Sequence, residues 1–478
     1  MARKYSWAFL LLAAVMLIIS GCSSSDSAQT AANGGKTGLS KDEISSEAFK
    51  DLFPLQYDSY QKTLQDTEDT KYSGSVKRAK YDADKEPYLP ILFNGYGFAL
   101  DYNEDRGHLY ANEDVRATLR ITDKSIGSCL TCKSTAVPQM IEEMGDDYWG
   151  GSFNDLIWPK AESMGHSPIG CSDCHDPETM DLRITRPSFT KGMASQGIDI
   201  ANATKNEMRS YVCAQCHVEY HFAASNGEVT FPWENGFKPE EMYEYYQTTA
   251  KEKGFNQDWI HNVSGTPMVK AQHPDFETHT EGPHGQAGVS CADCHMPYER
   301  VDGKKKISSH WMKSPLKSME QSCGTCHSNR ELEDLKARVG EIQDTHMTAL
   351  HAAEDVSISA HYYVNKMITS GVSEEKIKEA QEHVRKGQWF WDIVAAESGA
   401  GFHNPQGAMD SLRTSSDESN KAIQIATEEL TKKGVNLEEL KTEIEKAKKA
   451  VTDETENTKK REHALNPYFP AQQPAPKK

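Results

Sequence analysis

The sequence predicts a mainly α-helical fold in which a loop-rich body precedes long C-terminal helices. Between residues 57 and 327, Gly, Pro and Asn repeatedly interrupt the chain, which leaves short helical pieces and little strand alternation. From residue 331 onward, apolar residues recur at helical spacing, as in Leu335, Val339 and Ile342. Only 37% of the 478 residues are hydrophobic and the mean hydropathy is -0.69, which is lean for a body of this size. We therefore expect something other than side chains to fill part of the interior.

The N-terminus carries an export signal. Arg3 and Lys4 precede an apolar run over residues 7–19 that is too short to remain as a spanning helix. The run ends in Ile-Ser-Gly-Cys22, which resembles a bacterial lipoprotein signal, so residues 1–21 are expected to be removed and Cys22 to carry the lipid. An ordinary signal peptide with an incidental Cys22 is the alternative. Both interpretations place the protein outside the cytoplasm, on a periplasmic or other extracytoplasmic face.

A tether and a body follow the signal. Residues 22–50 are rich in Ser, Ala, Gly and Asp and are expected to form a flexible tether between the lipid and the folded chain. Residues 51–330 are expected to form the body. The whole chain has a formal net charge of -18, and the predicted signal peptide contains only positive charges. Such an acidic protein repels nucleic acid, and an anionic substrate needs a local cluster of cations.

The C-terminal region, residues 331–465, is expected to be helical. Two long helices are predicted up to about residue 398, with a break at Ser370-Gly371. A charged helical stretch follows over residues 410–460, interrupted near Gly434. These helices are expected to form packing or dimer surfaces. Residues 466–478 are rich in Pro and are expected to be disordered.

The cysteines form a regular pattern. Apart from Cys22, the ten remaining cysteines of the eleven fall into five Cys-x-x-Cys pairs. Four pairs are followed at once by histidine: Cys171/Cys174/His175, Cys213/Cys216/His217, Cys291/Cys294/His295 and Cys323/Cys326/His327. This is the pattern of c-type haem attachment, in which two thiols form thioethers to the vinyl groups and the imidazole binds the iron. Structural zinc would require pairs of pairs, and a disulfide within Cys-x-x-Cys is a redox-active arrangement.

The first pair differs from the other four. Cys129 and Cys132 are followed by Lys133 where the others have histidine. A lysine amine binds iron only when it is deprotonated, so the iron and a desolvated pocket must lower its pKa. The alternative is a surface lysine beside a degenerate haem site. With this pair included, the sequence predicts five covalently bound haems in residues 51–330.

At this point the sequence resembles the pentahaem cytochrome c nitrite reductases, the ammonia-forming family, over residues 88–405. The resemblance rests on the lone Cys-x-x-Cys-Lys before four Cys-x-x-Cys-His motifs, on Cys-Ala-Gln-Cys-His-Val-Glu-Tyr220, and on Lys270-Ala-Gln-His273-Pro. It implies a multihaem cytochrome c fold with the haems packed in the loop-rich body. It also implies a six-electron reduction of nitrite to ammonium at the haem bound by Lys133.

The resemblance implies three side chains around the open face of that haem: Arg120, Tyr220 and His273. An arginine supplies fixed positive charge for the anion, and the tyrosine and histidine donate hydrogen bonds and protons. The segment Asp-Val-Arg116-Ala-Thr-Leu-Arg120 offers two arginines, of which we favour Arg120.

Further ligands come from the same resemblance. It implies a calcium site from the Glu219 carboxylate, the Tyr220 and Lys270 carbonyls and the Gln272 side chain, an all-oxygen set that suits this cation. It selects as second axial ligands of the four other haems His108, His284, His310 and His403. The remaining histidines, among them His166, His221 and His261, are expected to be surface or packing residues.

Two other functions remain open from the sequence. One is a multihaem electron-transfer cytochrome, which requires protein ligands on both faces of every iron. The other is a related reductase of hydroxylamine, sulfite or another small oxyanion. The family implies a homodimer through the C-terminal helices, and the expected electron donor is a membrane quinol-linked or soluble multihaem cytochrome.

Overall fold

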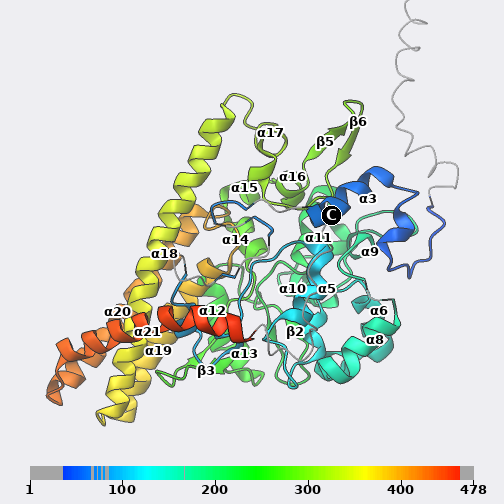
Figure 1. The fold of residues 1–478 in the computed structure, drawn as a ribbon. Coiled ribbons are helices and arrows are strands. Elements are labelled where there is room, and N and C mark those ends of the chain that lie inside the picture. The colour runs from blue at the N-terminus through cyan, green and yellow to red at the C-terminus, as the bar shows by residue number, and fades with distance from the viewer. Residues whose placement is uncertain are drawn as a thin grey trace, which may run out of the picture.

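The computed structural model describes residues 36–65, 69–72, 74–76, 79–80, 86–165 and 167–462, with the side chains of 452–462 left aside. Figure 1 shows a loop-rich body on one side and a set of long helices on the other, as predicted. The predicted features that fall outside the described residues are the signal peptide 1–21, Cys22, the first part of the tether up to residue 35, His166 and the tail 466–478.

The segment after residue 35 packs against the body. It contains η1 (Ser46–Phe49), α3 (Pro54–Gln61) and η2 (Lys62–Gln65). Phe49 is only 1% exposed, and the Thr37 amide donates a hydrogen bond to the Glu178 carbonyl at 2.8 Å. Residues 36–50 are therefore anchored by an aromatic side chain and by the backbone. The predicted tether, residues 22–50, is therefore wrong for residues 36–50, which pack against the body.

The body is built from short helices joined by loops. In chain order its α-helices are α4 (Leu89–Leu92), α5 (Ala111–Ala117), α6 (Val137–Met144), α7 (Asp146–Gly150), α8 (Trp158–Ser163), α9 (Cys171–Cys174), α10 (Pro187–Ser195), α11 (Lys205–Ala214), α12 (Pro239–Gln247), α13 (Thr249–Glu252), α14 (Asp275–Glu281), α15 (Pro283–Gln286), α16 (Cys291–His295) and α17 (Met319–Ser322). Shorter turns are η3 (Gly97–Ala99), η4 (His108–Tyr110), η5 (Gly127–Leu130), η6 (Phe153–Ile157), η7 (Ile200–Asn202) and η8 (Pro315–Lys317). Proline stands in the first turn of α10, α12 and α15, where its missing N–H costs no hydrogen bond.

Among the described residues, three small antiparallel hairpins complete the body. They pair β1 (His221–Phe222) with β2 (Val229–Thr230), β3 (Trp259–Ile260) with β4 (Pro267–Met268), and β5 (Tyr298–Val301) with β6 (Lys305–Ser308). Their registers join His221 to Thr230, Trp259 to Met268 and Tyr298 to Ser308. The first hairpin begins directly after Tyr220 and the second ends two residues before Lys270, so both hairpins fix segments that carry predicted site residues.

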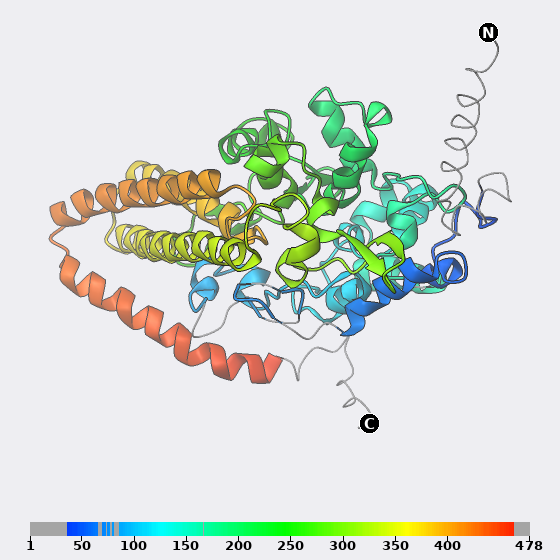
Figure 2. The same ribbon diagram turned by 90° about the horizontal axis from the view of Figure 1, so that it is seen from above.

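The C-terminal region consists of α18 (Leu332–Thr369), α19 (Glu374–Ala396), α20 (Pro405–Lys432) and α21 (Leu437–Glu462). The predicted breaks are confirmed: Gly371 and Gly434 have φ angles of 66° and 70°, which favour glycine and end the preceding helices. Figure 2 shows α18, α19 and α20 packed side by side, while α21, in red, crosses this set and contacts α18, α20 and α4. In the described part of the chain, no helix combines the length and apolarity needed to cross a bilayer.

Two hydrophobic clusters form the core. The cluster of the body is aromatic and includes Trp233, Phe189 and Tyr246. The other gathers aliphatic residues of the long helices, such as Ile358 and Leu412, with parts of the body near α4. Helix α19 contributes to both clusters, with Trp389 and Phe390 in the first and Trp391 in the second, so it joins the body to the other long helices.

Candidate active site

The Cys-x-x-Cys motifs all lie on helical turns of the body. Cys129 is in η5, Cys171 opens α9, Cys213 is near the end of α11, Cys291 opens α16 and Cys323 follows α17. Residues three apart on a helical turn lie on the same face, so each pair presents its two thiols to one side. The ten thiols are half-buried, except for that of Cys326, which is exposed.

The structure pairs each motif histidine with one of the four predicted second ligands. The imidazole centroids are 6.4 Å apart for His108 and His217, and 6.3 Å apart for His175 and His310, for His284 and His327, and for His295 and His403. An imidazole nitrogen lies about 2.0 Å from a bound transition metal, so two imidazoles on opposite sides of one metal have centroids roughly 6 to 6.5 Å apart. Each pair therefore has the spacing that one haem iron between its rings requires.

Hydrogen bonds at Nδ1 orient several of these rings. Nδ1 lies 2.9 Å from the Met180 carbonyl in His175, 3.0 Å from the Lys313 carbonyl in His295, and 2.9 Å from the Ser308 carbonyl in His310. In His403, Nδ1 contacts the Glu397 carboxylate, and in His217 it lies 3.4 Å from an Asp275 carboxylate oxygen. Nδ1–H donates in such contacts, which fixes the tautomer and leaves Nε2 as the nitrogen that can bind a metal.

Burial keeps most of these imidazoles neutral, as metal ligation requires. It lowers the pKa of His108, His295 and His310 to about 4. His403 differs, because the Glu397 carboxylate outweighs the effect of burial and raises the pKa of the ring to about 9. Glu397 is therefore an orienting carboxylate that sequence analysis missed. It lies six residues before His403, at the end of α19, and its spacing gives no signal.

His273 lies between two carboxylates. Its Nε2 is 3.2 Å from Asp105 Oδ2 and its Nδ1 is 3.2 Å from Asp275 Oδ2. Burial disfavours the charged ring, but Asp275 and Asp105 outweigh it and raise the pKa of His273. Burial alone would raise the pKa of Asp105, but the positive charges of Lys133 and His273 hold it well below the usual range. The structure therefore brings Lys133, Asp105 and His273 into one electrostatic group.

Asp275 also connects His273 to the paired histidines. Its carboxylate contacts His217 and accepts a hydrogen bond from the Ser398 amide at 2.8 Å. Sequence analysis missed both Asp105 and Asp275. Asp275 stands two residues after His273, which is a weak signal, whereas Asp105 comes from a loop far away in the chain.

The two candidate arginines have different surroundings. The Arg116 guanidinium lies 4.7 Å from the Trp158 ring centroid and donates to Asn154 Oδ1 at 3.2 Å. The Arg120 guanidinium lies 4.3 Å from the Phe98 ring centroid. Burial raises the pKa of the Tyr220 hydroxyl, and the charge of Arg120 counteracts that rise. Arg120 is thus the arginine whose positive charge acts on Tyr220.

The four predicted calcium ligands lie close together, with Glu219 and Lys270 buried and Tyr220 and Gln272 half-buried. Glu219 and Lys270 are 0% exposed, and the Gln272 amide donates to Glu219 Oε2 at 2.5 Å. The Gln272 side-chain amide lies 3.3 Å from the Lys270 carbonyl, and Tyr220 follows Glu219 directly. If the Gln272 side-chain amide is rotated by 180°, its oxygen takes the place of its nitrogen beside the Lys270 carbonyl.

Burial raises the pKa of Glu219 well above its ordinary value, although the Tyr246 hydroxyl donates to its Oε1 at 2.8 Å, and a cation beside the carboxylate would favour its ionised form. Carboxylate, carbonyl and amide oxygens are the ligands that calcium prefers, so the donor set fits this ion.

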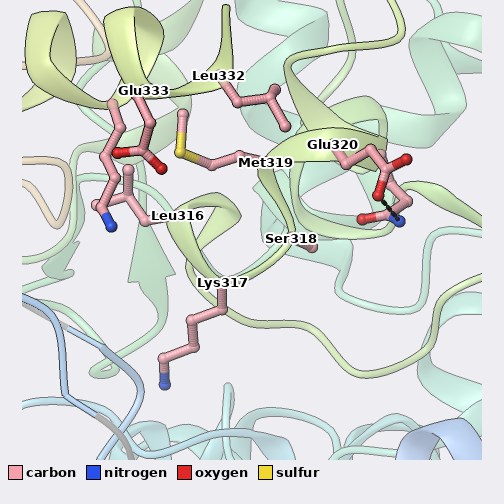
Figure 3. Close-up of a pocket in the computed structure, with 9 residues that line it drawn as sticks. Leu316, Lys317, Ser318, Met319, Glu320, Leu332 and Glu333 are labelled. Atoms are coloured by element: carbon pink, nitrogen blue, oxygen red, sulfur yellow. Dashed lines mark hydrogen bonds between the residues drawn. The ribbon is translucent and has the colours of Figure 1, made fainter.

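Figure 3 shows a surface hollow of about 310 Å³ between α17 and the start of α18. Its walls include Leu316, Met319 and Leu332, and Lys317 points away from them. None of the predicted site residues lines it. The candidate active site therefore rests on the converging side chains around Lys133 and not on this hollow.

Comparisons with known proteins agree with the resemblance. The profile of the cytochrome c552 family matches residues 45–477. The cytochrome c nitrite reductase subunit NrfA of Nitratidesulfovibrio vulgaris is 42% identical over 450 residues, which cover 88% of this chain and 85% of the relative. A cytochrome c-552 of Bacteroides thetaiotaomicron is 41% identical over 410 residues, 84% of this chain and 80% of the relative.

Among solved structures, the cytochrome c nitrite reductase of Desulfovibrio desulfuricans, a catalytic subunit described with two calcium sites, superposes with a TM-score of 0.77. It is 39% identical, and the match covers 84% of this chain and 91% of that one. The predicted mainly α, multihaem cytochrome c fold is thereby confirmed. The chain belongs to the cytochrome c552 family, in which it is an oxidoreductase related to the cytochrome c nitrite reductases.

Proposed function

We propose that this protein reduces nitrite to ammonium at a c-type haem bound by Cys129, Cys132 and Lys133. Four further haems, each held between two histidines, supply the electrons, which gives five haems in all. The observation that carries the proposal is the contrast between four histidine pairs at 6.3–6.4 Å and a fifth motif, with lysine, whose neighbourhood holds His273, Tyr220 and Arg120.

The state of His273 favours an enzyme over a protein that only transfers electrons. In the paired histidines whose contacts are described above, Nδ1 is bound and Nε2 is left for a metal. Both ring nitrogens of His273 face carboxylate oxygens at 3.2 Å. The two carboxylates favour the protonated ring, which cannot bind a metal, so one face of the haem at Lys133 would be left for a substrate.

Nitrite reduction requires positive charge to bind the anion and a supply of protons. Reduction of nitrite to ammonium takes up six electrons and eight protons and releases two water molecules. The iron, when bound, supplies the site for the nitrite nitrogen and passes on the electrons. Arg120 provides the fixed positive charge that binds the anion in an otherwise acidic protein. His273, whose pKa is raised, donates protons, and Tyr220 donates a hydrogen bond from its neutral hydroxyl.

The same proposal includes a calcium ion on Glu219, Tyr220, Lys270 and Gln272. Its charge neutralises the buried Glu219 carboxylate directly beside Tyr220. This cation reduces the negative potential near the anion site. Removal of calcium with a chelator is expected to weaken nitrite binding before it affects the haem content.

The remaining features of the proposal concern place and partners. Removal of residues 1–21 and lipid attachment at Cys22 hold the protein at the extracytoplasmic face of a membrane, with the body on residues 51–330. A quinol-linked or soluble multihaem cytochrome donates the electrons. Two copies associate through the C-terminal helices, of which α18 and α20 are the longest.

The experiment measures ammonium formed from nitrite by purified holoprotein with a reduced viologen as the electron donor. The wild type is expected to form ammonium stoichiometrically, and Lys133→Ala is expected to lose about 10²-fold or more in kcat/KM. Lys124→Ala, an exposed lysine of the preceding loop, is the matched control. The proposal fails if the wild type is no faster than Lys133→Ala. It also fails if the ferric protein has no iron with an open or water-bound position by spectroscopy.

A further inference from the structure

A second group of ligand-type side chains lies apart from all residues assigned so far. It consists of Glu86, just before α4, with His351 and Glu354 on α18. One ligand atom from each residue lies within 4.8 Å of those of the other two. His351 Nε2 is 3.1 Å from Glu86 Oε1, which is already the separation of two ligands on one small cation.

The local structure explains why these groups meet. His351 and Glu354 are three residues apart on α18, so they lie on the same face of the helix. α18 packs against α4 at this point, which brings Glu86 over that face. The cluster is therefore formed by two elements that the fold holds together through the aliphatic core.

Within the described part of the chain, each of the two carboxylates has one oxygen without a hydrogen-bond partner. Glu354 is only 1% exposed, and its Oε1 has no hydrogen-bond partner. Glu86 Oε2 is also buried without a partner. Two acceptors in one cluster without donors are costly to bury, and such groups require an explanation by a bound ion or water.

The nearby ammonium of Lys448 acts on Glu354 but is shared with other carboxylates. Lys448 on α21 bonds Asp355, and its Nζ lies 2.8 Å from Glu445 Oε1. The junction of α4, α18 and α21 thus contains four carboxylates, of which Asp355 and Glu445 contact that ammonium directly. A doubly charged cation between Glu86 and Glu354 would offset the excess and supply the missing partner for both oxygens.

We propose that Glu86, His351 and Glu354 form a site for a divalent transition-metal cation of the zinc or manganese class. An imidazole with two carboxylates suits such ions, whereas calcium prefers oxygen ligands alone. Three protein ligands leave a position for water. His351 is exposed, so the ion reaches the site from the solvent. The site shares no residue with the proposed haem and calcium sites.

The test measures zinc in the holoprotein. Purified protein is incubated with Zn²⁺, passed through a desalting column and analysed for zinc and iron per chain, and the dissociation constant is measured by competition with a zinc-sensitive chelator. The wild type is expected to retain about one additional zinc ion per chain. His351→Gln and Glu354→Gln are expected to bind it roughly tenfold to a hundredfold more weakly, with unchanged iron content and unchanged nitrite reduction.

His383→Gln is the matched control, because His383 Nδ1 also contacts a glutamate of the helical region, Glu418 Oε2, at 2.6 Å. This variant is expected to bind zinc as the wild type does. The proposal is overturned if the wild type retains no more zinc than the double variant of His351 and Glu354. Equal loss in His383→Gln would overturn it as well. Glu86→Gln, on a different element, repeats the test if a helix variant lowers the yield of folded protein.

Discussion

The loop-rich body and the C-terminal helices close their interiors in different ways. In the helices, apolar side chains fill the space, and Ile358, Val364 and Trp391 are all 0% exposed. In the body, aromatic residues such as Trp233 are equally buried, yet half-buried thiols and histidine pairs separated by more than 6 Å lie among them. Side chains alone therefore complete the helical region, whereas the body leaves room for a prosthetic group that must complete it.

The strongest test of this difference between the two regions is to remove the haem. Protein produced without haem attachment should lose the folded body and retain the packed helices, because only the body depends on haem for its interior. Amide hydrogen exchange should show the protection of α11 and α14 falling to that of an unfolded chain, a change of about 5 kcal/mol or more. Helices α18–α20 should keep most of their protection. Equal loss in both regions would mean that they fold only as one unit.

A second test distinguishes the two candidate arginines of the body. Arg120→Gln should lower kcat/KM for nitrite by about 10²- to 10³-fold, because it removes the charge that acts at the substrate and at Tyr220. Arg116→Gln, whose guanidinium lies against Trp158, should cost only a few-fold. Steady-state kinetics of both variants decide which arginine acts. A larger loss in Arg116→Gln would reverse the assignment.

A smaller effect concerns the carboxylate that His273 and His217 share. Asp275→Asn should reduce kcat/KM at neutral pH by about 10- to 100-fold, because the ring loses an orienting partner. Asp275 helps to raise the pKa of His273, so its loss lowers that pKa. The protonated ring then disappears at lower pH, and the alkaline limb of the activity profile should move towards acid.

Ser398→Ala provides the control for this carboxylate. Its hydroxyl lies 3.3 Å from Asp275 Oδ2, and the backbone amide that also binds Asp275 is kept. The position of the alkaline limb should therefore stay as in the wild type. An unshifted limb in Asp275→Asn would instead exclude His273 as the proton donor.

The smallest expected effect is on stability and concerns Glu418 on α20. Burial disfavours the ionised Glu418 carboxyl, but contacts with His383 and two lysines outweigh it and lower the pKa below its ordinary 4.5. A lowered folded-state pKa stabilises the protein above the unfolded value and loses that effect as pH falls through the folded value. Glu418→Gln should thus cost less than about 1 kcal/mol near pH 7, and nothing in more acidic solution. Thermal unfolding at both pH values measures this, and activity should not change.

The helical region could be predicted closely from the sequence. Helical periodicity and two glycines with positive φ determine its breaks, and both signals are local. The end of the tether was less predictable, because the burial of Phe49 depends on residues distant in the chain. In the body, the motifs indicate where haem is attached, since each motif is a contiguous stretch of sequence.

The rest of the site could not be obtained from local patterns. His175 and His310 meet although 134 residues separate them along the chain, and only the packing of loops brings them together. The family resemblance selected His310 without stating its partner. Asp105 and Glu397 gave no signal, because an acidic residue in a loop of an acidic protein is usually a solvated one.

In the proposed arrangement, with export of the chain and one haem at each histidine pair, the pairs also imply an order in which the haems are completed. His217 and His327 each pair with a histidine that precedes them, namely His108 and His284, so both partners have already left the export channel when these motifs emerge. The partners of His175 and His295 are His310 and His403, which lie later in the chain and emerge after them. With the proposed ligands, a chain that emerges from its N-terminus would complete two haems early, and the other two would receive their second ligand only when later segments arrive. The last of these segments is the loop before α20, so a chain truncated there would be exported with a haem that still lacks its second ligand.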